Sequence, residues 1–500
     1  MYCLGIDLGS SSVKVTLLDA LSGKRFASTQ YPDSELLISA PQSGFAEQDP
    51  DTWWDATEKA IERLKQNFVF DPKDINAIGI SYQMHGLVCV DSSQRVVRPS
   101  IIWCDSRAVE IGADAFDSLG KEYCATHLLN SPGNFTASKL KWVQTHQPDI
   151  YQQIDKIMLP GDYIAMRLTG EVNTTALGLS EAILWDHQNN QLSKELMDHY
   201  GFKDTLIPTI VPTFGDQGTV LKDVAQRLGL HNKVKVTYRA GDQPNNALSL
   251  NVMEPGEVAT TAGTSGVIYA VTDKKIGDEK SRVNTFLHPK DSSPEGISKE
   301  SEHTRNGILL CVNGTGRMNS WLKGIVGTDN NMSYEHMNAL AQDVEIGAEG
   351  LAVHPFGNGA ERMFENQVRG GDFQHIDFNR HHLGHIIRAT QEGIVFALNY
   401  GFDMLKAMGV DSKCIKAPYG NMFLSPIFTE AFVNTCECKL ELYDTDGAEG
   451  AARAAAYGLG FYKSQIEMFT GIEHLRTYLP ENDKVEQYKQ SYDHWKQSID

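Results

Sequence analysis

The chain has 500 residues, 41% of them apolar, and its formal net charge is −19. This length and apolar content allow at least two well-buried domains. The acidic balance argues against a nucleic acid partner, because nucleic acid phosphates require a basic face. The eight cysteines show no framework spacing and no CxxC pair, which indicates free thiols and a cytoplasmic location. No basic-then-apolar leader precedes the first strand, and no apolar stretch reaches the length of a membrane span.

The first elements are predicted to be antiparallel strands at residues 2–7, 13–18 and 25–31, each an apolar run bounded by turn residues. A helix follows, with Asp49 as its N-cap and Pro50 in its first turn. Its apolar stripe consists of Trp53, Trp54, Ala56, Ala60, Ile61 and Leu64. A short apolar strand at 75–81 comes next. Strands joined through a crossover helix predict an α/β architecture.

The second half is expected to repeat this order. The repeated order is expected after residue 255, with a long helix near 383–408 and a strand just before Gly420, while the first half is predicted to close with a strand at 234–238. At the C-terminus, apolar residues at alternating spacings of three and four predict an amphipathic helix that packs on the body; they are Val485, Tyr488, Tyr492, Trp495 and Ile499. We therefore expect two domains, at 1–253 and 254–500.

A short phrase that occurs twice supports this division. Residues 7–19 read DLGSSSVKVTLLD and residues 261–273 read TAGTSGVIYAVTD, and Gly9 aligns with Gly263 without a gap. A glycine and small hydroxyl residues before an apolar run predict the tip of a β-hairpin, whose N–H groups and hydroxyls can bind an anion. One such tip is ordinarily only a turn. Two in register favour a pair of similar domains that hold a phosphate chain from opposite sides.

Two aspartates are candidates for phosphate chemistry. Asp7 stands at a strand end beside the first tip, where a carboxylate can hold Mg²⁺ directly or through water. Asp242 lies in a Gly-Asp-Gln turn and could accept a proton from a hydroxyl. Its structural alternative is an N-cap of the following helix. The position of Asp242 near the domain boundary, where a cleft is expected, favours the base.

Two polar clusters are candidates to bind a polyhydroxylated ligand. Gln83 and His85 follow the strand at 75–81, and ligands bind at the carboxyl ends of such strands. A lone histidine is more often structural. Trp103, Asp105 and Arg107 form the second cluster, in which the two charged residues are either a structural ion pair or the wall of a polar pocket. An acidic, glycine-rich turn at 443–452 opens an alanine-rich helix, which predicts close helix packing or nucleoside binding.

The segments DLGSSSVK, GDQ, GTSG and DGAEGAARAAA, in this order, resemble those of the FGGY carbohydrate kinases. The resemblance runs from residue 1 to about residue 460 and includes FTASKLKW at 135–142 and GAER at 359–362. It implies two actin-like, ribonuclease-H-like α/β domains with a cleft between them, and phosphorylation of a sugar by ATP with Mg²⁺. Within the family, QMHG at 83–86 with WxDxR at 103–107 is similar to the xylulokinases, which implies D-xylulose as the substrate.

The resemblance also implies roles for individual residues. Asp242 would be the base and Asp7 would act near Mg²⁺. The sugar would contact Gln83, Met84, His85, Trp103, Asp105, Arg107, Asp242 and Gln243. ATP would contact Gly9, Ser10, Ser11, Ser12, Lys14, Gly263, Thr264, Gly316, Gly420, Asn421 and Ser425.

Alternatives stay open at this point. The same chemistry could serve another ketose, a polyol or a sugar acid, such as ribulose or gluconate. A non-kinase actin-like ATPase and a sugar sensor without catalysis are the more distant alternatives. The expected partners are the sugar and ATP, with no nucleic acid and no membrane, and a homodimer is left open.

Overall fold

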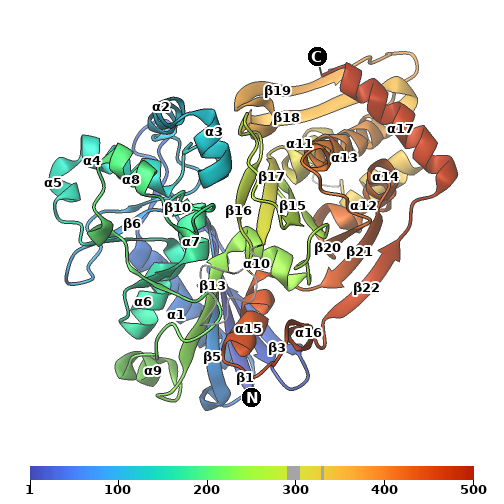
Figure 1. Cartoon of the computed structure of the whole chain (residues 1–500). Helices are drawn as coiled ribbons and strands as arrows, with labels where there is room; N and C mark the ends of the chain where they lie inside the picture. The colour runs from blue at the N-terminus through green and yellow to red at the C-terminus, as the bar shows by residue number, and fades with distance from the viewer. Residues whose placement is uncertain (290–304, 328–331, 500) are drawn as a thin grey trace.

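The computed structural model describes residues 1–289, 305–327 and 332–499, and its elements form two α/β halves that lie side by side (Figure 1). The chain opens with an antiparallel meander, β1 (Tyr2–Leu8), β2 (Val13–Asp19) and β3 (Lys24–Tyr31), as predicted. Strands β5 (Ile75–Tyr82) and β13 (Lys235–Gly241) continue this sheet in parallel, in the order β13-β5-β1-β2-β3.

The second sheet repeats this topology. Strands β14 (Val258–Ala262), β15 (Gly266–Thr272) and β17 (Asn306–Val312) form the meander, and β20 (Cys414–Pro418) and β21 (Lys439–Asp444) run parallel to β14. The edge strands β16 (Asn284–Leu287) and β22 (Glu473–Tyr478) extend the sheet to seven strands. The repeated phrase therefore marks two halves with related sheets.

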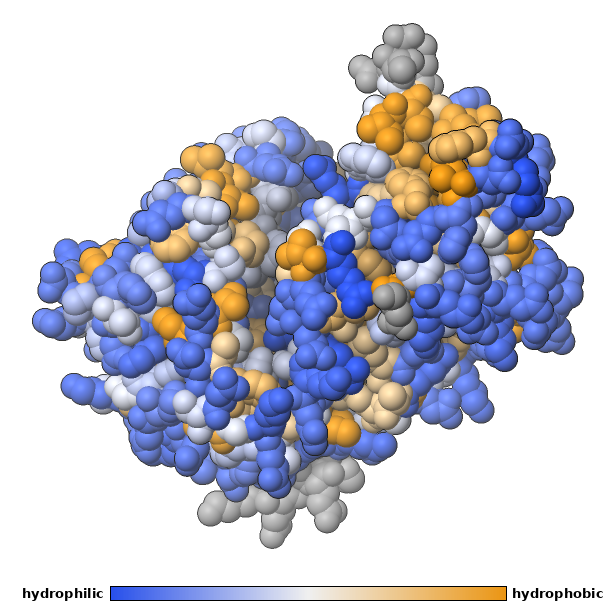
Figure 2. Space-filling view, turned by 90° about the horizontal axis from the view of Figure 1, so that it is seen from above, coloured by the Kyte–Doolittle hydropathy of each residue, from blue (hydrophilic) through white to orange (hydrophobic). Residues whose placement is uncertain are grey.

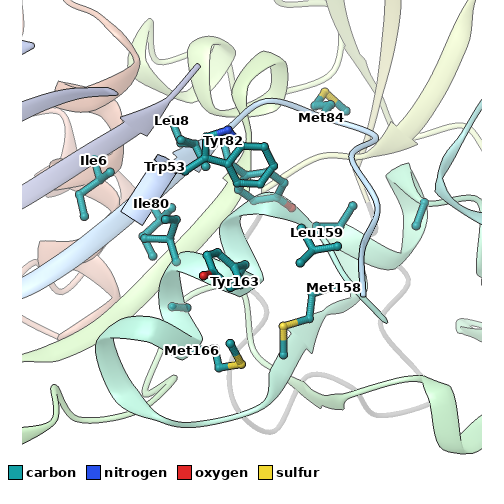
Figure 3. Packing of buried hydrophobic residues seen from close by; sticks show 14 of the residues in the cluster. Ile6, Leu8, Trp53, Ile80, Tyr82, Met84, Met158, Leu159, Tyr163 and Met166 are labelled. Atoms are coloured by element: carbon teal, nitrogen blue, oxygen red, sulfur yellow. The ribbon is translucent and has the colours of Figure 1, made fainter. Parts of the chain in front are cut away.

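Helix α1 (Pro50–Asn67) confirms its sequence signals. The Asp49 side chain accepts a hydrogen bond from the Asp51 N–H at 3.0 Å, Pro50 stands in the first turn, and the predicted stripe is buried against the first sheet. Helix α6 (Pro160–Thr169) covers the same layer. Figure 3 shows its Tyr163 close to Ile80 of β5, and the same buried cluster includes Met166 of α6, Ile6 of β1 and Tyr82 of β5.

The long helix α13 (Leu383–Ala407) runs through the second half and is buried over most of its length. The C-terminal helix α17 (Asn482–Gln497) packs on this half through Tyr488, Tyr492 and Trp495, as its spacing predicted. Ile499, the last residue of the predicted stripe, lies beyond the helix end.

Helix α15 (Gly447–Gly458) follows the second sheet in the chain but packs on the first. Glycines make this approach possible. A Cβ atom on Gly5 of β1 would lie 1.7 Å from the Ala448 carbonyl oxygen, and one on Gly79 of β5 would lie 2.0 Å from that of Ala451. The alanine-rich face of α15 joins a core cluster with Cys3, Leu18 and Ala77. The division at residues 253 and 254 places this helix in the second domain, and that division stays a prediction.

The remaining elements are short or connect the layers. They are β4 (Glu47–Gln48), β6 (Val88–Val90), β7 (Ser100–Ile101), α2 (Val109–Leu119), α3 (Lys121–Tyr123), α4 (Thr136–His146), α5 (Pro148–Tyr151), β8 (Lys156–Met158), β9 (Asn173–Thr175), α7 (Ala176–Glu181), β10 (Trp185–Asp186), β11 (Gln191–Leu192), α8 (Lys194–Tyr200), β12 (Thr209–Val211), α9 (Lys222–Leu228), α10 (Asp242–Ser249), α11 (Thr315–Val326), α12 (Tyr334–Gln342), β18 (Ala352–Glu361), β19 (Gln367–Gln374), α14 (Pro426–Cys436) and α16 (Gln465–Met468).

The surface is mainly hydrophilic. Figure 2 shows a face on which most apolar residues form small groups, with one larger group at the upper right and a hollow between the two halves. In the three described ranges, no helix is both long enough and apolar enough to cross a bilayer.

Candidate active site

The first predicted phosphate tip joins β1 to β2. Leu8 pairs with Val13, so residues 9–12 form the turn. The Gly9 N–H donates to the Ser12 carbonyl oxygen at 3.0 Å. The Ser10 carbonyl accepts from Gln48 Nε2 at 2.7 Å, and the Ser11 carbonyl accepts from the Leu36 N–H at the same distance, 2.7 Å. Neighbouring segments thus fix the main chain of this tip.

The second tip is one residue shorter. Ala262 pairs with Gly266, so only residues 263–265 form the turn. The two sequence segments align without a gap, but their strands pair in different registers on either side of the turn. Helix α11 begins against this tip. The Gly316 N–H donates to the Gly263 carbonyl oxygen at 2.9 Å, and a Cβ on Gly316 would lie 2.3 Å from that oxygen. Glycine is therefore required where α11 meets the tip.

A cavity of about 470 Å³ lies beside the second tip. Five of the predicted nucleotide residues line it: Gly263, Thr264, Gly316, Asn421 and Ser425. The predicted Gly420 lies outside this lining. Helix α12 contributes Tyr334, Glu335 and Asn338 to the same wall, and the sequence motifs did not identify these residues.

Asp7 and Lys14 face each other at the base of the first tip. Asp7 Oδ1 accepts from Ser81 Oγ at 2.7 Å. Lys14, predicted to bind phosphate, pairs with Asp446 at 2.6 Å, and Asp446 also caps α15 by accepting from the Glu449 N–H. Burial raises the pKa of the Asp7 carboxyl; the Ser81 hydrogen bond opposes this rise and the nearby Asp446 adds to it.

The surroundings of Asp7 fit a magnesium ion held mainly by phosphate and water. A Cβ on Gly447 would lie 2.6 Å from Asp7 Oδ2 and 3.0 Å from Asn246 Oδ1, so both oxygens meet at one point beside Gly447, where no side chain fits. Among the described residues, no group of three or more His, Cys, Asp or Glu could hold a metal alone. Mg²⁺ typically takes one or two carboxylates together with substrate phosphates.

Asp242 is the first residue of α10, and Gly241 occupies the cap position. The N-cap alternative for Asp242 is therefore not what the structure shows. Burial, and then the charge of Asp7, raise the pKa of Asp242 to about 7, although the Gln243 N–H opposes the rise. A carboxyl group that titrates near neutrality is suited to accept a proton from a hydroxyl.

Glu181 packs against Gly241, the residue before Asp242, and no sequence motif identified it. It ends α7 and is 2% exposed, and a Cβ on Gly241 would lie 2.4 Å from its Oε2. Burial, and then Asp242, raise the pKa of Glu181 well above its usual range. Its main-chain oxygen is 3.0 Å from His85 Nδ1. Glu181 thus contacts the segments that carry both Asp242 and His85.

The predicted residues after β5 lie in the same region. His85 has a left-handed backbone (φ 63°), and its ring meets Phe135 edge-on at 4.8 Å. Burial, and then Lys139, lower the pKa of His85 to about 3, so the imidazole is neutral. Met84 is buried against Gly241. The buried Gln83 donates through Nε2 to Gln48 Oε1 at 3.3 Å.

Lys139 supports this region from α4. Its Nζ donates to the carbonyl oxygens of His85 at 2.8 Å and Ile102 at 3.0 Å, and burial lowers its pKa to about 7. The side chain therefore joins the loop after β5 to the loop that begins at Ile102. The sequence marked Lys139 only as part of the FTASKLKW segment.

The second polar cluster contains the predicted ion pair. Asp105 and Arg107 are joined at 2.7 Å, and their side chains are 0% and 1% exposed. Arg107 also pairs with Glu47 at 2.7 Å. Of the two interpretations offered for this pair, the structure shows the structural ion pair. Contact of either residue with a sugar stays a prediction. Trp103 on the same loop is 53% exposed, and its Nε1 is 3.4 Å from Ser10 Oγ.

Comparison with known proteins adds the family. Residues 2–249 match the N-terminal domain of the FGGY family of carbohydrate kinases. The chain belongs to this family. The xylulose kinase of Bacillus subtilis (strain 168) is 29% identical over 506 residues, which cover 99% of this chain and 96% of that protein.

Solved structures agree with this assignment. The crystal structure of a xyloylose kinase from Brucella ovis has a TM-score of 0.88 at 25% identity and covers 100% of this chain and 98% of its own. A gluconate kinase from Lactobacillus acidophilus has the same TM-score, 0.88, at 22% identity, covers 99% and 97% of the two chains, and shows the fold alone. The FGGY protein thus has two actin-like domains and is an ATP-dependent carbohydrate kinase. Kinase activity is favoured over the ATPase and sensor alternatives.

Proposed function

We propose that this FGGY kinase transfers the γ-phosphoryl group of ATP to the terminal primary hydroxyl of D-xylulose and forms D-xylulose 5-phosphate. The observation that carries the proposal is the position of Asp242, whose pKa is about 7 and which lies within electrostatic reach of both Asp7 and Glu181. Similarity to a xylulose kinase over 99% of the chain supports the choice of sugar.

In the proposed reaction, Asp242 accepts the proton of the sugar hydroxyl. The hydroxyl oxygen then bonds to the γ-phosphorus while the bond between that phosphorus and the ADP oxygen breaks, with the two oxygens roughly in line. Asp7 and Asn246 would hold Mg²⁺, which when bound with ATP offsets negative charge on the phosphates. Most of the rate increase comes from positioning and from charge stabilisation, because the protein has little covalent chemistry to perform.

The two ligands occupy separate regions in this proposal. Met84, His85, Gln83 and Trp103 lie on the sugar side together with Gln243. The nucleotide occupies the cavity beside the second tip, and its phosphates reach the first tip and Lys14. The unpaired state of all eight cysteines supports the predicted cytoplasmic location. A homodimer stays a prediction.

A substrate panel tests the proposal. ATP consumption is measured with ketoses, polyols and sugar acids, and D-xylulose is expected to give the highest kcat/KM. A clear preference for ribulose or gluconate would overturn the choice of sugar. ATP hydrolysis that does not depend on any sugar would instead favour the actin-like ATPase.

A further inference from the structure

Two consecutive residues at the end of β18 contact different regions of the molecule. Glu361 is the last residue of the strand, and Arg362 begins the short turn that follows. Glu361 is fully buried, and Arg362 is partly buried. Neither residue belongs to the proposed sugar or nucleotide contacts.

Glu361 holds the loop that begins α11. Its two carboxylate oxygens accept from the Asn313 N–H at 3.0 and 3.3 Å. Asn313 in turn donates through Nδ2 to the Ala360 carbonyl oxygen at 2.8 Å. Three residues later Gly316 binds the Gly263 carbonyl, so Glu361 fixes the loop that supports the second tip. Burial raises the pKa of the Glu361 carboxyl to about 8, and the hydrogen bond from the Asn313 N–H opposes this rise.

Arg362 points toward the sugar side. Its Nε donates to the Ser281 carbonyl oxygen at 2.9 Å, and its guanidinium lies 5.4 Å from the ring centroid of Phe135. Ser281 Oγ donates to Ser131 Oγ at 2.8 Å, which crosses from the second half of the chain to the first. The Phe135 ring meets His85. Arg362 therefore contacts the loop that supports the predicted sugar-binding histidine.

The contacts of the two residues form a continuous series from His85 and Phe135, through Arg362 and Glu361, to Asn313 and the second tip. We propose that Glu361 and Arg362 are positioning residues that couple the sugar side to the nucleotide side, so that each ligand increases the affinity for the other. This inference rests on the proposed function. The coupling is reciprocal, because a change in one binding equilibrium requires the same change in the other.

Calorimetry tests the coupling. The Kd of a non-hydrolysable ATP analogue with Mg²⁺ is measured with and without saturating D-xylulose, or with the sugar that the panel selects. In the unaltered protein the sugar is expected to lower this Kd at least about fivefold, the lower end of typical coupling. In Glu361→Ala and Arg362→Ala this factor is expected to fall below about twofold. In Arg362→Ala, whose side chain contacts Ser281 and Phe135 and not the second tip, the Kd for the analogue alone is expected to change little.

Matched variants separate coupling from structural damage. Glu361→Gln keeps an oxygen acceptor for the Asn313 N–H and is expected to retain the full factor. Arg380→Ala removes an exposed arginine that pairs with Glu349, and it is expected to change nothing. Should Arg362→Ala fail to fold, Ser281→Ala removes the hydroxyl that contacts Ser131 and the Arg362 guanidinium, and it is expected to reduce the factor. Retention of the full factor in both Glu361→Ala and Ser281→Ala would overturn the inference.

The proposed function can fail separately. If the unaltered protein turns over no sugar, the kinase proposal is wrong. If it turns over a sugar but the sugar leaves the Kd of the analogue unchanged, the coupling inference alone is wrong.

Discussion

At the residue scale, Asp242 carries the proposed chemistry. Replacing it by Asn removes the proton acceptor while nearly preserving the shape of the side chain, so kcat is expected to fall by about 10²–10⁴-fold. The affinity for a non-hydrolysable ATP analogue is expected to stay the same. Steady-state kinetics and calorimetry measure the two quantities. The exposed Asp223→Asn is the control, and normal turnover in Asp242→Asn would exclude Asp242 as the base.

The raised pKa of Asp242 predicts how activity depends on pH. The base acts only when ionised, so kcat/KM is expected to rise as the pH increases through about 7, with a slope of one on logarithmic axes below that value. A pH–rate profile from pH 5 to 9 measures this. A profile that is flat between pH 5 and 7 would contradict the prediction.

The same group affects stability in the opposite direction. Because its pKa is raised in the folded state from 3.8 to about 7, Asp242 contributes stability that is fully present below about pH 4 and is lost as the pH rises through 7. Urea midpoints measured over this range are expected to decline less in Asp242→Asn than in the unaltered protein.

Local motifs identified the residues whose surroundings lie mostly in their own segment. Recognisable turns contain Asp7, Gly263 and Asp242. Asp105 and Arg107 are two residues apart, and an ion pair between them is already one of two interpretations of the sequence. Glu181 could not be found this way, because its importance arises only when α7 packs behind Gly241. The role of Lys139 depends likewise on two carbonyl oxygens from distant loops.

At the element scale, the contact between α15 and the first sheet depends on glycines in β1 and β5. In Gly79→Ala the new Cβ would meet the Ala451 carbonyl oxygen, so the helix must move. We expect a loss of about 1–3 kcal/mol or more in the free energy of unfolding, which is typical of overpacking. Chemical denaturation measures this loss.

Gly324→Ala is the matched control within a helix. No atom lies within 4 Å of a Cβ at Gly324, so Ala is expected to stabilise α11 by up to about 1 kcal/mol. Equal effects of the two substitutions would show that the close approach of α15 does not limit stability.

Sequence patterns predicted most strands and helices to within a few residues, because apolar periodicity and caps are local signals. Strand β13 is longer than predicted, since its parallel pairing with β5 continues from Tyr238 to Gly241. The strand pairing of the second hairpin also differed from that of the first, although the two sequences align without a gap. Hydrogen bonding in the turn, and not sequence alignment, sets the register. Nothing in the alanine-rich composition of α15 specified which sheet it covers.

At the scale of the whole molecule, the predicted first domain, 1–253, lacks its α15 cover. Expressed alone, this fragment would expose the apolar face that packs against Ala451 and Ala452, and we expect it to unfold without a cooperative transition. Joining residues 445–472 to it through a flexible linker is expected to restore cooperativity. Denaturation followed by circular dichroism and fluorescence measures both fragments. Cooperative unfolding of 1–253 alone would show that the sequence boundary is also a folding boundary.

The return of α15 also affects how the protein is made. The last strand of the first sheet ends at Gly241, but the sheet cannot receive its α15 cover until the ribosome has synthesised residue 458, which takes roughly 25–90 s at ordinary elongation rates. From the synthesis of β5 until that point, the glycine-containing strands β1 and β5 present an uncovered apolar face on the nascent chain. The first part of this enzyme to be synthesised is therefore among the last to finish folding, and molecular chaperones have this interval in which to bind it.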